Sequence, residues 1–281
     1  MQNEVIYHRW APSLGALEDT AENVWGTTEY EGDRDEPTVF FGLYGLPDFY
    51  TLWRHRGKKW ILWAGTDITH FKNGYWLEEG GGIRLDPMPL AEWINKNCES
   101  WVENEVEQKA LAELGIESTV GQSFLGDVNR FQAWYTHSTT PKLYTSVSGD
   151  NYDLYGWDKI PQLAQDNPDI EFHLYGNSPK YPLYLMGIPN VIIHGKVSKE
   201  EMNNDIRGMQ GALRLTEFDG FSEILAKSLL MGQWPVSRIP YLYTLPVDEI
   251  DDLKNMKNVN TTGRKFYLST LNSFPWNLKK K

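Results

Sequence analysis

The sequence has very little cysteine, since Cys98 is the only one among 281 residues. A disulfide within the chain is therefore excluded, and so is a metal site built from several cysteines. Disulfides are typical of oxidising compartments, so this composition favours a reducing one. We expect a cytoplasmic protein.

Long hydrophobic runs and low-complexity segments are also missing. No apolar stretch reaches the roughly 18–20 residues that span a bilayer, and the first residues lack the basic and apolar regions of a secretory signal. We therefore expect no transmembrane segment. Glycine and proline are not in excess, which argues against a disordered chain.

Positive charge is scarce, because 27 Lys and Arg stand against 38 Asp and Glu and leave a formal net charge of -11. Such a surface repels the phosphates of nucleic acids, so a nucleic-acid partner is not expected. The one basic run, at residues 279–281, is interpreted as a solvated terminal tail.

Hydrophobic and aromatic residues are plentiful. Hydrophobic residues make up 41% of the chain, enough for a sizeable core, and aromatic residues make up 14%, with 12 Trp. The aromatic surplus fits a core of large side chains, and it equally fits a cleft that stacks on sugars or bases. The length predicts two domains.

Short apolar runs alternate with amphipathic stretches along the chain, a pattern typical of βαβ units and parallel sheets. We expect strands at 5–7, 38–43, 60–64, 99–102, 118–124, 142–147, 170–174, 191–193, 212–215 and 235–237. We expect helices at 16–24, 49–55, 90–97, 105–114, 156–165, 198 onward, 222–231, 248–256 and 266–274. A polar stretch at 129–141 resembles a linker and predicts domains at 1–135 and 136–281.

Ligands of open α/β sheets bind beyond the carboxyl ends of strands, and three turns there carry polar chemistry. The first is Gly65-Thr66-Asp67 after the strand at 60–64. Thr66 and Asp67 offer groups for sugar hydroxyls, or Asp67 serves as a base. The alternative is an Asp that bonds the backbone of its own turn. His70 follows, and a lone histidine is more commonly structural.

The second turn holds Gly176, Asn177 and Lys180 after the strand at 170–174. A glycine loop with a lysine is able to hold a phosphate, although a plain turn explains these residues equally well.

The third turn runs from Arg214 to Glu223 and leads from a strand into a helix. The first backbone amides of a helix, together with its dipole, bind phosphate, and Gly220 lets those amides approach a ligand. Arg214 suits a pyrophosphate, while Glu217, Asp219 and Glu223 suit sugar hydroxyls. The alternative is an Asp or Ser N-cap surrounded by solvated acids.

The segment that begins at Asp219 reads DGFSEILAKSLLMGQWPV and resembles the donor-site helix of retaining GT-B glycosyltransferases, the group 1 family. Members read acid-Gly-Phe-Gly/Ser, then a second Glu within an apolar helix, then Gly-x-Pro-Val. Residues 99–121, 172–176 and 191–197 are similar to other parts of the family in the same order. The resemblance covers most of residues 99–236.

The resemblance implies an α/β GT-B-like fold with two Rossmann-like domains that face a cleft. The nucleotide-sugar would bind mainly to the C-terminal domain and the acceptor mainly to the N-terminal one, with no metal and no other cofactor. Asp219 would contact the donor sugar, and Gly220, Phe221 and Ser222 would form the loop that cradles sugar and phosphate. Asp67, with Gly65, Thr66 and His70, becomes the candidate acceptor side.

We therefore expect a retaining glycosyltransferase that takes a nucleotide-sugar donor. Its acceptor would be a saccharide, a lipid or a small molecule. We also expect the C-terminal helix to pack back on the N-terminal domain.

Three features depart from the family pattern. The second acid falls at Lys227, whose ammonium cannot accept hydrogen bonds from ribose hydroxyls, although Glu223 stands one helical turn earlier. No Arg or Lys directly follows Val147, where the family has a basic pair, so Arg214 or Lys180 would compensate. The chain is also shorter than most members, with the difference expected in the N-terminal domain.

These departures keep two alternatives open. One is a degenerate protein that binds a nucleotide or sugar without turnover. The other is a different GT-B enzyme, such as a sugar-nucleotide epimerase or a glycosyltransferase that acts on modified DNA, although the net charge of -11 disfavours DNA.

Overall fold

The computed structural model describes residues 5–12, 14, 25–75, 84–147, 149–176 and 182–280. The helix predicted at 16–24 lies outside the described residues. The chain forms two compact units. Unit 1 comprises Met1–Asp127, Phe218–Phe221 and Ser269–Lys281, and unit 2 comprises Val128–Glu217 and Ser222–Leu268. The domain boundary expected at 135/136 stays a prediction.

Unit 1 is built on a six-stranded sheet in which every ladder is parallel, in the order β2-β1-β3-β4-β5-β6. Its strands are β1 (Tyr7–Trp10), β2 (Thr28–Glu29), β3 (Thr38–Phe41), β4 (Lys59–Leu62), β5 (Glu99–Val102) and β6 (Ser118–Val120). Its helices are α2 (Leu46–Arg54), α3 (Thr66–Lys72), α4 (Pro87–Asn97) and α5 (Glu105–Ala112).

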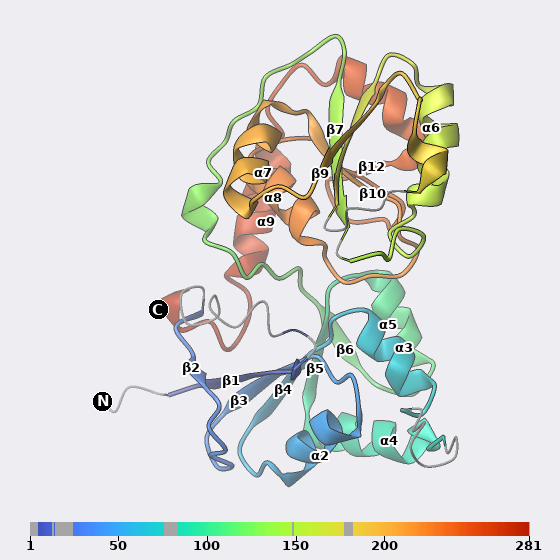
Figure 1. Ribbon diagram of the computed structural model, residues 1–281. Coiled ribbons are helices and arrows are strands. Elements are labelled where there is room, and N and C mark those ends of the chain that lie inside the picture. Colours follow the sequence, from blue (N-terminus) through green and yellow to red (C-terminus); the bar gives the residue numbers. More distant parts are fainter. Residues whose placement is uncertain are drawn as a thin grey trace. The chain divides into compact units, whose positions relative to one another are not determined.

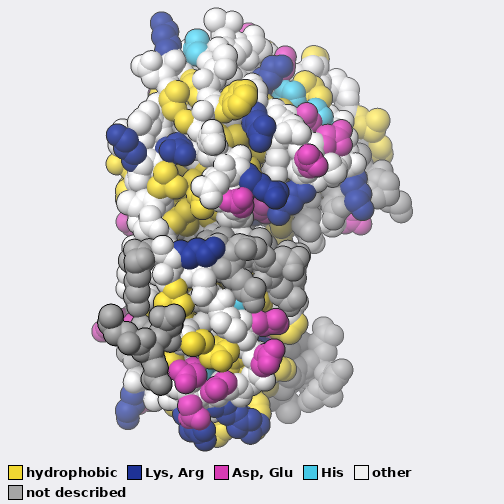
Figure 2. Space-filling model, turned by 90° about the vertical axis from the view of Figure 1, so that its left-hand side faces the viewer, with side chains coloured by type: hydrophobic (Ala, Val, Ile, Leu, Met, Phe, Trp, Pro, Cys, Tyr) yellow, Lys and Arg dark blue, Asp and Glu magenta, His cyan; other side chains and the backbone are white. Residues whose placement is uncertain are grey.

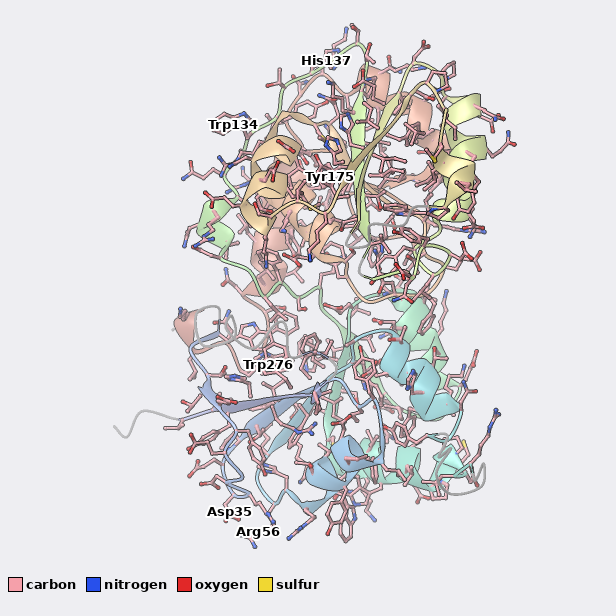
Figure 3. The ribbon with its side chains drawn as sticks, in the orientation of Figure 1. Asp35, Arg56, Trp134, His137, Tyr175 and Trp276 are labelled. Carbon is pink, nitrogen blue, oxygen red and sulfur yellow. The ribbon has the colours of Figure 1, made fainter. Side chains whose placement is uncertain are left out.

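Both faces of this sheet are buried, because apolar side chains on neighbouring positions of a strand point to opposite faces. On β3, Phe40 packs with the apolar residues of α2 to α5, whereas Val39 and Phe41 pack on the other face. That second face is covered partly by the C-terminal segment. Trp276 lies there, with its ring 4.8 Å from that of Phe274 (Figure 3).

Unit 2 is built on a second six-stranded sheet, also parallel in every ladder, in the order β12-β11-β10-β7-β8-β9. Its strands are β7 (Lys142–Val147), β8 (Glu171–Gly176), β9 (Val191–Gly195), β10 (Gly211–Arg214), β11 (Val236–Ser237) and β12 (Leu245–Pro246). Its helices are α6 (Ile160–Asp166), α7 (Lys199–Asp205), α8 (Glu223–Leu230) and α9 (Thr261–Leu271), of which α9 continues into unit 1 from Ser269. Figure 1 shows α6 on one face of the sheet and α7, α8 and α9 on the other.

Helix α8, which follows the Asp219-Gly220-Phe221-Ser222 motif, is buried at every residue from Ile224 to Leu230. Its sequence is apolar on nearly all sides, which is the pattern of a helix enclosed by other elements. The body of this helix from Ile224 onward is therefore enclosed within unit 2, whereas its first residue, Glu223, is exposed.

The structure confirms the alternating α/β pattern and corrects several elements. Pro235–Ser237 was expected to be the last strand, but β12 follows it and pairs with β11. Residues 248–256 form a 3-10 helix, Val247–Asn255, rather than an ordinary helix. The turn expected at Thr66 and Asp67 is the first turn of α3. Strand β12 has too few residues for periodicity to detect, and an amphipathic pattern does not by itself distinguish a 3-10 helix from an α-helix.

Among the described residues, no helix is both long and apolar enough to cross a bilayer.

Candidate functional site

Arg214 lies at the carboxyl ends of the adjacent strands β10 and β11, where the sequence predicted the donor side of the site in unit 2. Arg214 is the last residue of β10 and pairs in register with Ser237 at the end of β11. Only 7% of Arg214 is exposed, and its guanidinium lies 4.2 Å from the centre of the Tyr155 ring. A cation over an aromatic face is stabilised by the ring quadrupole. The predicted donor side therefore holds a buried cation whose orientation is fixed by the Tyr155 ring.

Gly156 explains how Tyr155 reaches this position. Gly156 has a φ of +74°, and a Cβ built there would lie 2.6 Å from the Cβ of Leu215. Only glycine permits both the backbone conformation and the close approach. The loop after β7 thus lies directly against the chain that leaves β10. This loop presents the ring of Tyr155 to the guanidinium of Arg214.

Two groups of ion pairs surround the predicted acids of unit 2. Glu217 contacts Lys159 at 3.2 Å and Arg238 at 2.9 Å, and the hydrogen bond from Lys159 is the main reason that the pKa of Glu217 is lowered. Glu223 contacts Lys227 at 2.9 Å and Lys199 at 3.5 Å. Cations therefore outnumber carboxylates in each group, although the chain as a whole is acidic.

Lys227, which stands where the family has an acid, is only 4% exposed. Burial lowers the pKa of its ammonium, and the neighbouring Glu223 opposes that effect. Burial alone would raise the pKa of Glu223, but the two lysines outweigh it and the pKa is lowered. The pair therefore remains a carboxylate beside a cation, and the carboxylate is the group able to accept hydrogen bonds.

Thr216 stands two residues after Arg214 and carries a buried hydroxyl group. Its side-chain hydroxyl is buried and has no hydrogen-bond partner among the described residues. A buried hydroxyl without a partner costs free energy, so such groups commonly mark a place where a water or ligand binds.

The segment Phe218–Phe221, which carries the acid-Gly-Phe motif, belongs to unit 1. The side chain of Asn104 donates to the backbone carbonyl of Asp219 at 2.7 Å. The backbone N–H of Phe221 donates to the carboxylate of Glu103 at 2.6 Å. The motif residues Asp219, Gly220 and Phe221 are thus held by side chains that the sequence analysis did not identify.

The turn that carries Glu103 and Asn104 is itself fixed by α5. Asn104 is the N-cap of this helix, and its side chain accepts from the backbone N–H groups of Val106 and Glu107 at 3.0 Å. Glu107 in turn accepts from the backbone N–H of Glu103 at 2.7 Å. The Asn-x-x-Glu spacing at 104–107 resembles a capping box. Together with the position of Glu103 directly after β5, that spacing was the available sequence signal.

Three buried carboxyl groups lie in this part of unit 1. Burial raises the pKa of Asp67 to about 6 and that of Glu103 to about 7. Burial also raises the pKa of Glu107 well above its usual range, and the neighbouring Glu103 adds to the effect. Asp219 contributes to the raised pKa values of both Glu103 and Glu107. The site therefore holds protons at neutral pH that exposed carboxyls would have lost.

Asp67 itself is fully buried and closes two turns. Its carboxylate accepts from the backbone N–H groups of Leu43, Ala64 and Ile68 at 2.9 to 3.0 Å. These bonds tie the loop after β3 to the start of α3, as in the backbone-bonding alternative considered for this residue. A catalytic role for Asp67 stays a prediction.

The other predicted acceptor-side residues lie close to Asp67 in sequence and structure. Gly65 is the buried N-cap of α3, Thr66 is half-buried and His70 is exposed. A ring nitrogen of His70 lies 3.2 Å from the carbonyl oxygen of Tyr44, and the two rings are edge to face. His70 is therefore the accessible polar side chain of this group.

The remaining predicted donor residues fall in two places. Gly176 ends β8 and pairs in register with Val147, whereas Asn177 and Lys180 lie outside the described residues. Ser222 is the N-cap of α8 by position, but its hydroxyl makes no capping hydrogen bond. The interpretation of Ser222 as a side-chain cap is therefore wrong, and that hydroxyl does not satisfy the first amides of the helix.

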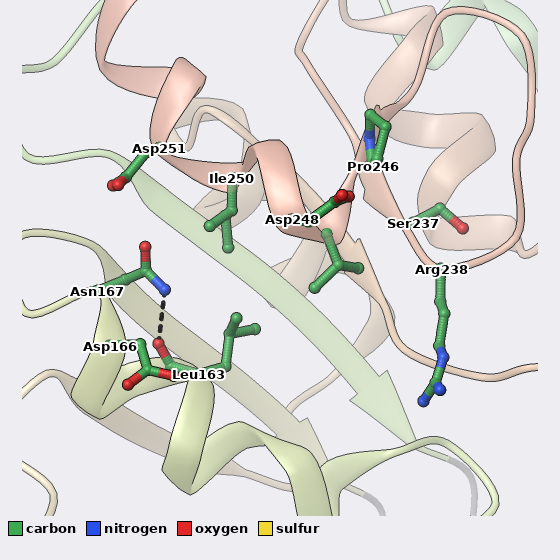
Figure 4. A pocket seen from close by; sticks show the side chains of 10 residues that line it. Leu163, Asp166, Asn167, Ser237, Arg238, Pro246, Asp248, Ile250 and Asp251 are labelled. Carbon is green, nitrogen blue, oxygen red and sulfur yellow. Dashed lines mark hydrogen bonds between the residues drawn. The ribbon is translucent and has the colours of Figure 1, made fainter.

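A pocket of unit 2, of about 560 Å³, is lined by none of the predicted site residues themselves, although its lining includes Arg238, the partner of Glu217, and Ser237, which pairs in register with Arg214. It lies between α6 and the 3-10 helix Val247–Asn255, with Asp166, Asp248 and Asp251 at its wall (Figure 4). Over the described part of the chain, no group of three or more His, Cys, Asp or Glu side chains is arranged to hold a metal ion.

Surface charge on the face drawn in Figure 2 is mixed, with Lys and Arg scattered among acidic and neutral side chains rather than gathered in one stripe.

Replacing Glu107 with Gln should change how the stability of the protein depends on pH, because folded Glu107 keeps its proton. Above the unfolded pKa near 4.5, the unfolded chain releases its proton while folded Glu107 keeps it, so wild-type stability falls as pH rises. Glutamine imitates the protonated form and removes this loss. We expect the midpoint of Glu107→Gln to match wild type at pH 4.5 and to exceed it by about 2 °C or more at pH 8, measured by calorimetry. A difference that does not change with pH would contradict the assignment.

Comparison with known proteins gives a likeness of fold. No protein-family model and no curated protein matches the chain. The solved structure of S. aureus TarM with fondaparinux, alpha-GlcNAc-glycerol and UDP matches 86% of this chain at 12% identity, with a TM-score of 0.53. The match covers 52% of TarM, so the chain spans about half the length of that protein.

In two further matches, this chain aligns with a larger share of the other protein. Sucrose-phosphate synthase from Thermosynechococcus elongatus matches 86% of this chain and 71% of its own, at 11% identity and a TM-score of 0.58. Anabaena HepE in complex with UDP-glucose matches 98% of this chain and 96% of its own, at 9% identity and a TM-score of 0.55. With the two parallel sheets, these likenesses confirm the predicted α/β GT-B-like fold.

Proposed function

We propose that this protein is a glycosyltransferase that moves a sugar from a nucleotide-sugar, of the UDP-sugar class, to a saccharide, lipid or small-molecule acceptor. One observation carries the proposal. Along the chain, the Asp219-Gly220-Phe221-Ser222 motif follows the parallel strand β10, which ends at Arg214, and leads into the buried helix α8, in a fold shared over nearly the whole chain with HepE in complex with UDP-glucose.

The proposed reaction breaks the bond between the anomeric carbon of the donor sugar and the diphosphate oxygen. The electron pair leaves with the diphosphate, and the acceptor hydroxyl oxygen bonds the anomeric carbon and gives its proton to a phosphate oxygen. We propose that this occurs with retention and without a metal. The charge of the leaving diphosphate then needs cations fixed in advance, and the buried Arg214 and Lys227 suit that task.

The remaining roles follow from the placement of each group. Asp219 contacts the donor sugar, while Gly220 and Ser222 let backbone amides approach the phosphates. Glu223 takes the nucleotide ribose in place of the family's second acid, because its carboxylate is kept ionised beside Lys227. The orphaned hydroxyl of Thr216 gains a partner when the donor binds. On the acceptor side, His70 is the accessible polar side chain.

Binding of nucleoside diphosphates is the direct test of the donor site. A ligand that binds only the folded state stabilises it by about 2.7 kcal/mol at a hundredfold excess over its dissociation constant. For a chain of this size that corresponds to a rise in midpoint of roughly 5 °C or more. We expect UDP to produce this shift in a panel with GDP, ADP, TDP, CDP and CMP, and Arg214→Ala to lose it.

The matched control is Arg207→Ala, which also removes an arginine that lies over an aromatic ring, that of Trp134. This variant should keep the full UDP shift. If Arg214→Ala binds UDP as well as wild type does, the donor site is wrongly placed. If UDP binds but UDP-sugars give no product with any acceptor and no altered sugar, the protein is the non-catalytic binder. A changed sugar without an acceptor identifies an epimerase.

A further inference from the structure

We propose that Glu103 is a positioning residue that, together with Asn104, holds the Asp219–Phe221 segment in the shape needed to contact the donor sugar. The inference rests on the proposed function for its catalytic consequence, whereas the structural hold can be measured without it. In this proposal Glu103 and Asn104 do not contact the substrate. They act through the backbone of the motif.

The carboxylate of Glu103 is surrounded by donors. One oxygen accepts from the backbone N–H and the hydroxyl of Ser123, at 3.1 and 2.5 Å. The other accepts from the backbone N–H of Phe221 at 2.6 Å. Only 4% of Glu103 is exposed, so these bonds are shielded from water. A carboxylate is the side chain that accepts on both oxygens at once, and hydrogen bonds to an ionised acceptor are the strong ones.

Two glycines, Gly220 and Gly65, allow the motif backbone to lie close to Glu103 and to the turn before α3. A Cβ on Gly220 would lie 2.3 Å from a carboxylate oxygen of Glu103. A Cβ on Gly65 would lie 2.6 Å from the backbone nitrogen of Gly220. The motif backbone is therefore enclosed between Glu103 and the turn before α3, and Asn104 fixes the carbonyl of Asp219. Three successive motif residues have their backbone set by this arrangement.

The hold depends on the charge of Glu103. A protonated carboxyl has an O–H in place of one acceptor, and that O–H would face a donor. The titratable groups around Glu103 are acids: Glu107 on α5, Asp67 on α3 and Asp219 on the motif segment itself, with the Tyr44 hydroxyl nearby. Burial, reinforced by Asp219, raises the pKa of Glu103 to about 7. Turnover should therefore decline as pH falls through about 7.

Hydrogen exchange tests the hold on the backbone without any substrate. The comparison uses wild type, Glu103→Gln and the control Glu105→Gln, whose exposed side chain lies on the next helix. Glutamine keeps the size of the side chain but turns one oxygen into a donor. We expect faster exchange in the peptide that spans residues 218–222 for Glu103→Gln alone, with α8 unchanged. Equal protection in all three proteins would overturn the proposal.

Activity tests the catalytic consequence in the same three proteins. Misplacing a reacting group by about 1 Å costs up to roughly a hundredfold in rate. We expect kcat of Glu103→Gln to fall about 10- to 100-fold, with the UDP-induced shift in midpoint retained, and its acid limb near pH 7 to disappear. A kcat and pH profile equal to those of Glu105→Gln would overturn the positioning role.

The two failures are distinguishable. If wild type shows no transfer and no UDP binding while Glu103→Gln still exposes residues 218–222 to exchange, the proposed function fails and the structural hold stands. If wild type transfers sugar and Glu103→Gln matches it in exchange and in rate, the positioning role fails and the function stands.

Discussion

Asp219→Ala should abolish sugar transfer while the protein remains folded. The hydrogen bond from Asn104 goes to the backbone carbonyl of Asp219, so it survives replacement of the side chain. The bond between Phe221 and Glu103 survives for the same reason. What is lost is a carboxylate that we propose to contact the donor sugar as it transfers. Loss of one such transition-state contact costs on the order of 10²- to 10³-fold in kcat.

The measurement is kcat for transfer from a UDP-sugar, with the thermal midpoint followed in parallel. Asp219→Asn separates charge from shape, because it keeps the size of the side chain and its hydrogen-bonding capacity in part. Asp248→Ala serves as the matched control, since Asp248 is an exposed aspartate on the 3-10 helix Val247–Asn255. A rate for Asp219→Ala equal to that of the control would remove Asp219 from the donor site.

Gly65→Ala should lower both the stability of the protein and the rate of transfer, because it strains the backbone and displaces the motif. Gly65 has a φ of +86°, a region that alanine rarely adopts. The added Cβ would also lie 2.6 Å from the nitrogen of Gly220 and 3.1 Å from the carbonyl carbon of Asp219. These neighbours are backbone atoms held by Glu103 and Asn104, so they cannot move aside without losing those bonds.

Gly115→Ala is the control for Gly65→Ala, because Gly115 has a φ of +75° but nothing lies within 4 Å of its Cβ position. That substitution should cost only the backbone strain, about 1 kcal/mol. We expect Gly65→Ala to cost about 2–4 kcal/mol, from strain and displacement together, and to lower kcat. Calorimetry on both variants measures the difference. Equal losses would show that the motif backbone is free to yield at this contact.

Much of the fold could be predicted from short-range patterns. The strands at 99–102 and 142–147 have the predicted bounds, because each is a short apolar run between polar or turn residues. The helix predicted from residue 198 onward is confirmed as α7, and Ser198 is its N-cap, with a side chain that accepts from the N–H of Glu201. In these places local chemistry and tertiary packing demand the same conformation.

Other elements could not be predicted because their cause is remote in sequence. Strand β12 has only two residues, and it is a strand because β11 offers it a parallel edge. The importance of Glu103 comes from a hydrogen bond to a residue 118 positions away. No pattern within a window of a dozen residues contains that information.

The sequence by itself determined the class of the molecule. The alternating strand and helix patterns predict a parallel α/β protein, and the single cysteine excludes a disulfide within the chain. The sequence also singled out the Asp-Gly-Phe-Ser segment as the candidate donor motif. Periodicity carries the first conclusion because it depends on residues close together in the sequence, whereas the second rests on the resemblance of this segment to the GT-B glycosyltransferases.

Only the tertiary structure decided what holds that motif. It placed Phe218–Phe221 with unit 1, against Glu103, Asn104 and Gly65, although unit 2 precedes and follows the segment along the chain. It also gave Arg214 an aromatic partner, Tyr155, in place of a second cation. The physical reason is the same in both cases. Buried polar and charged groups need partners, and folding draws those partners from any part of the chain.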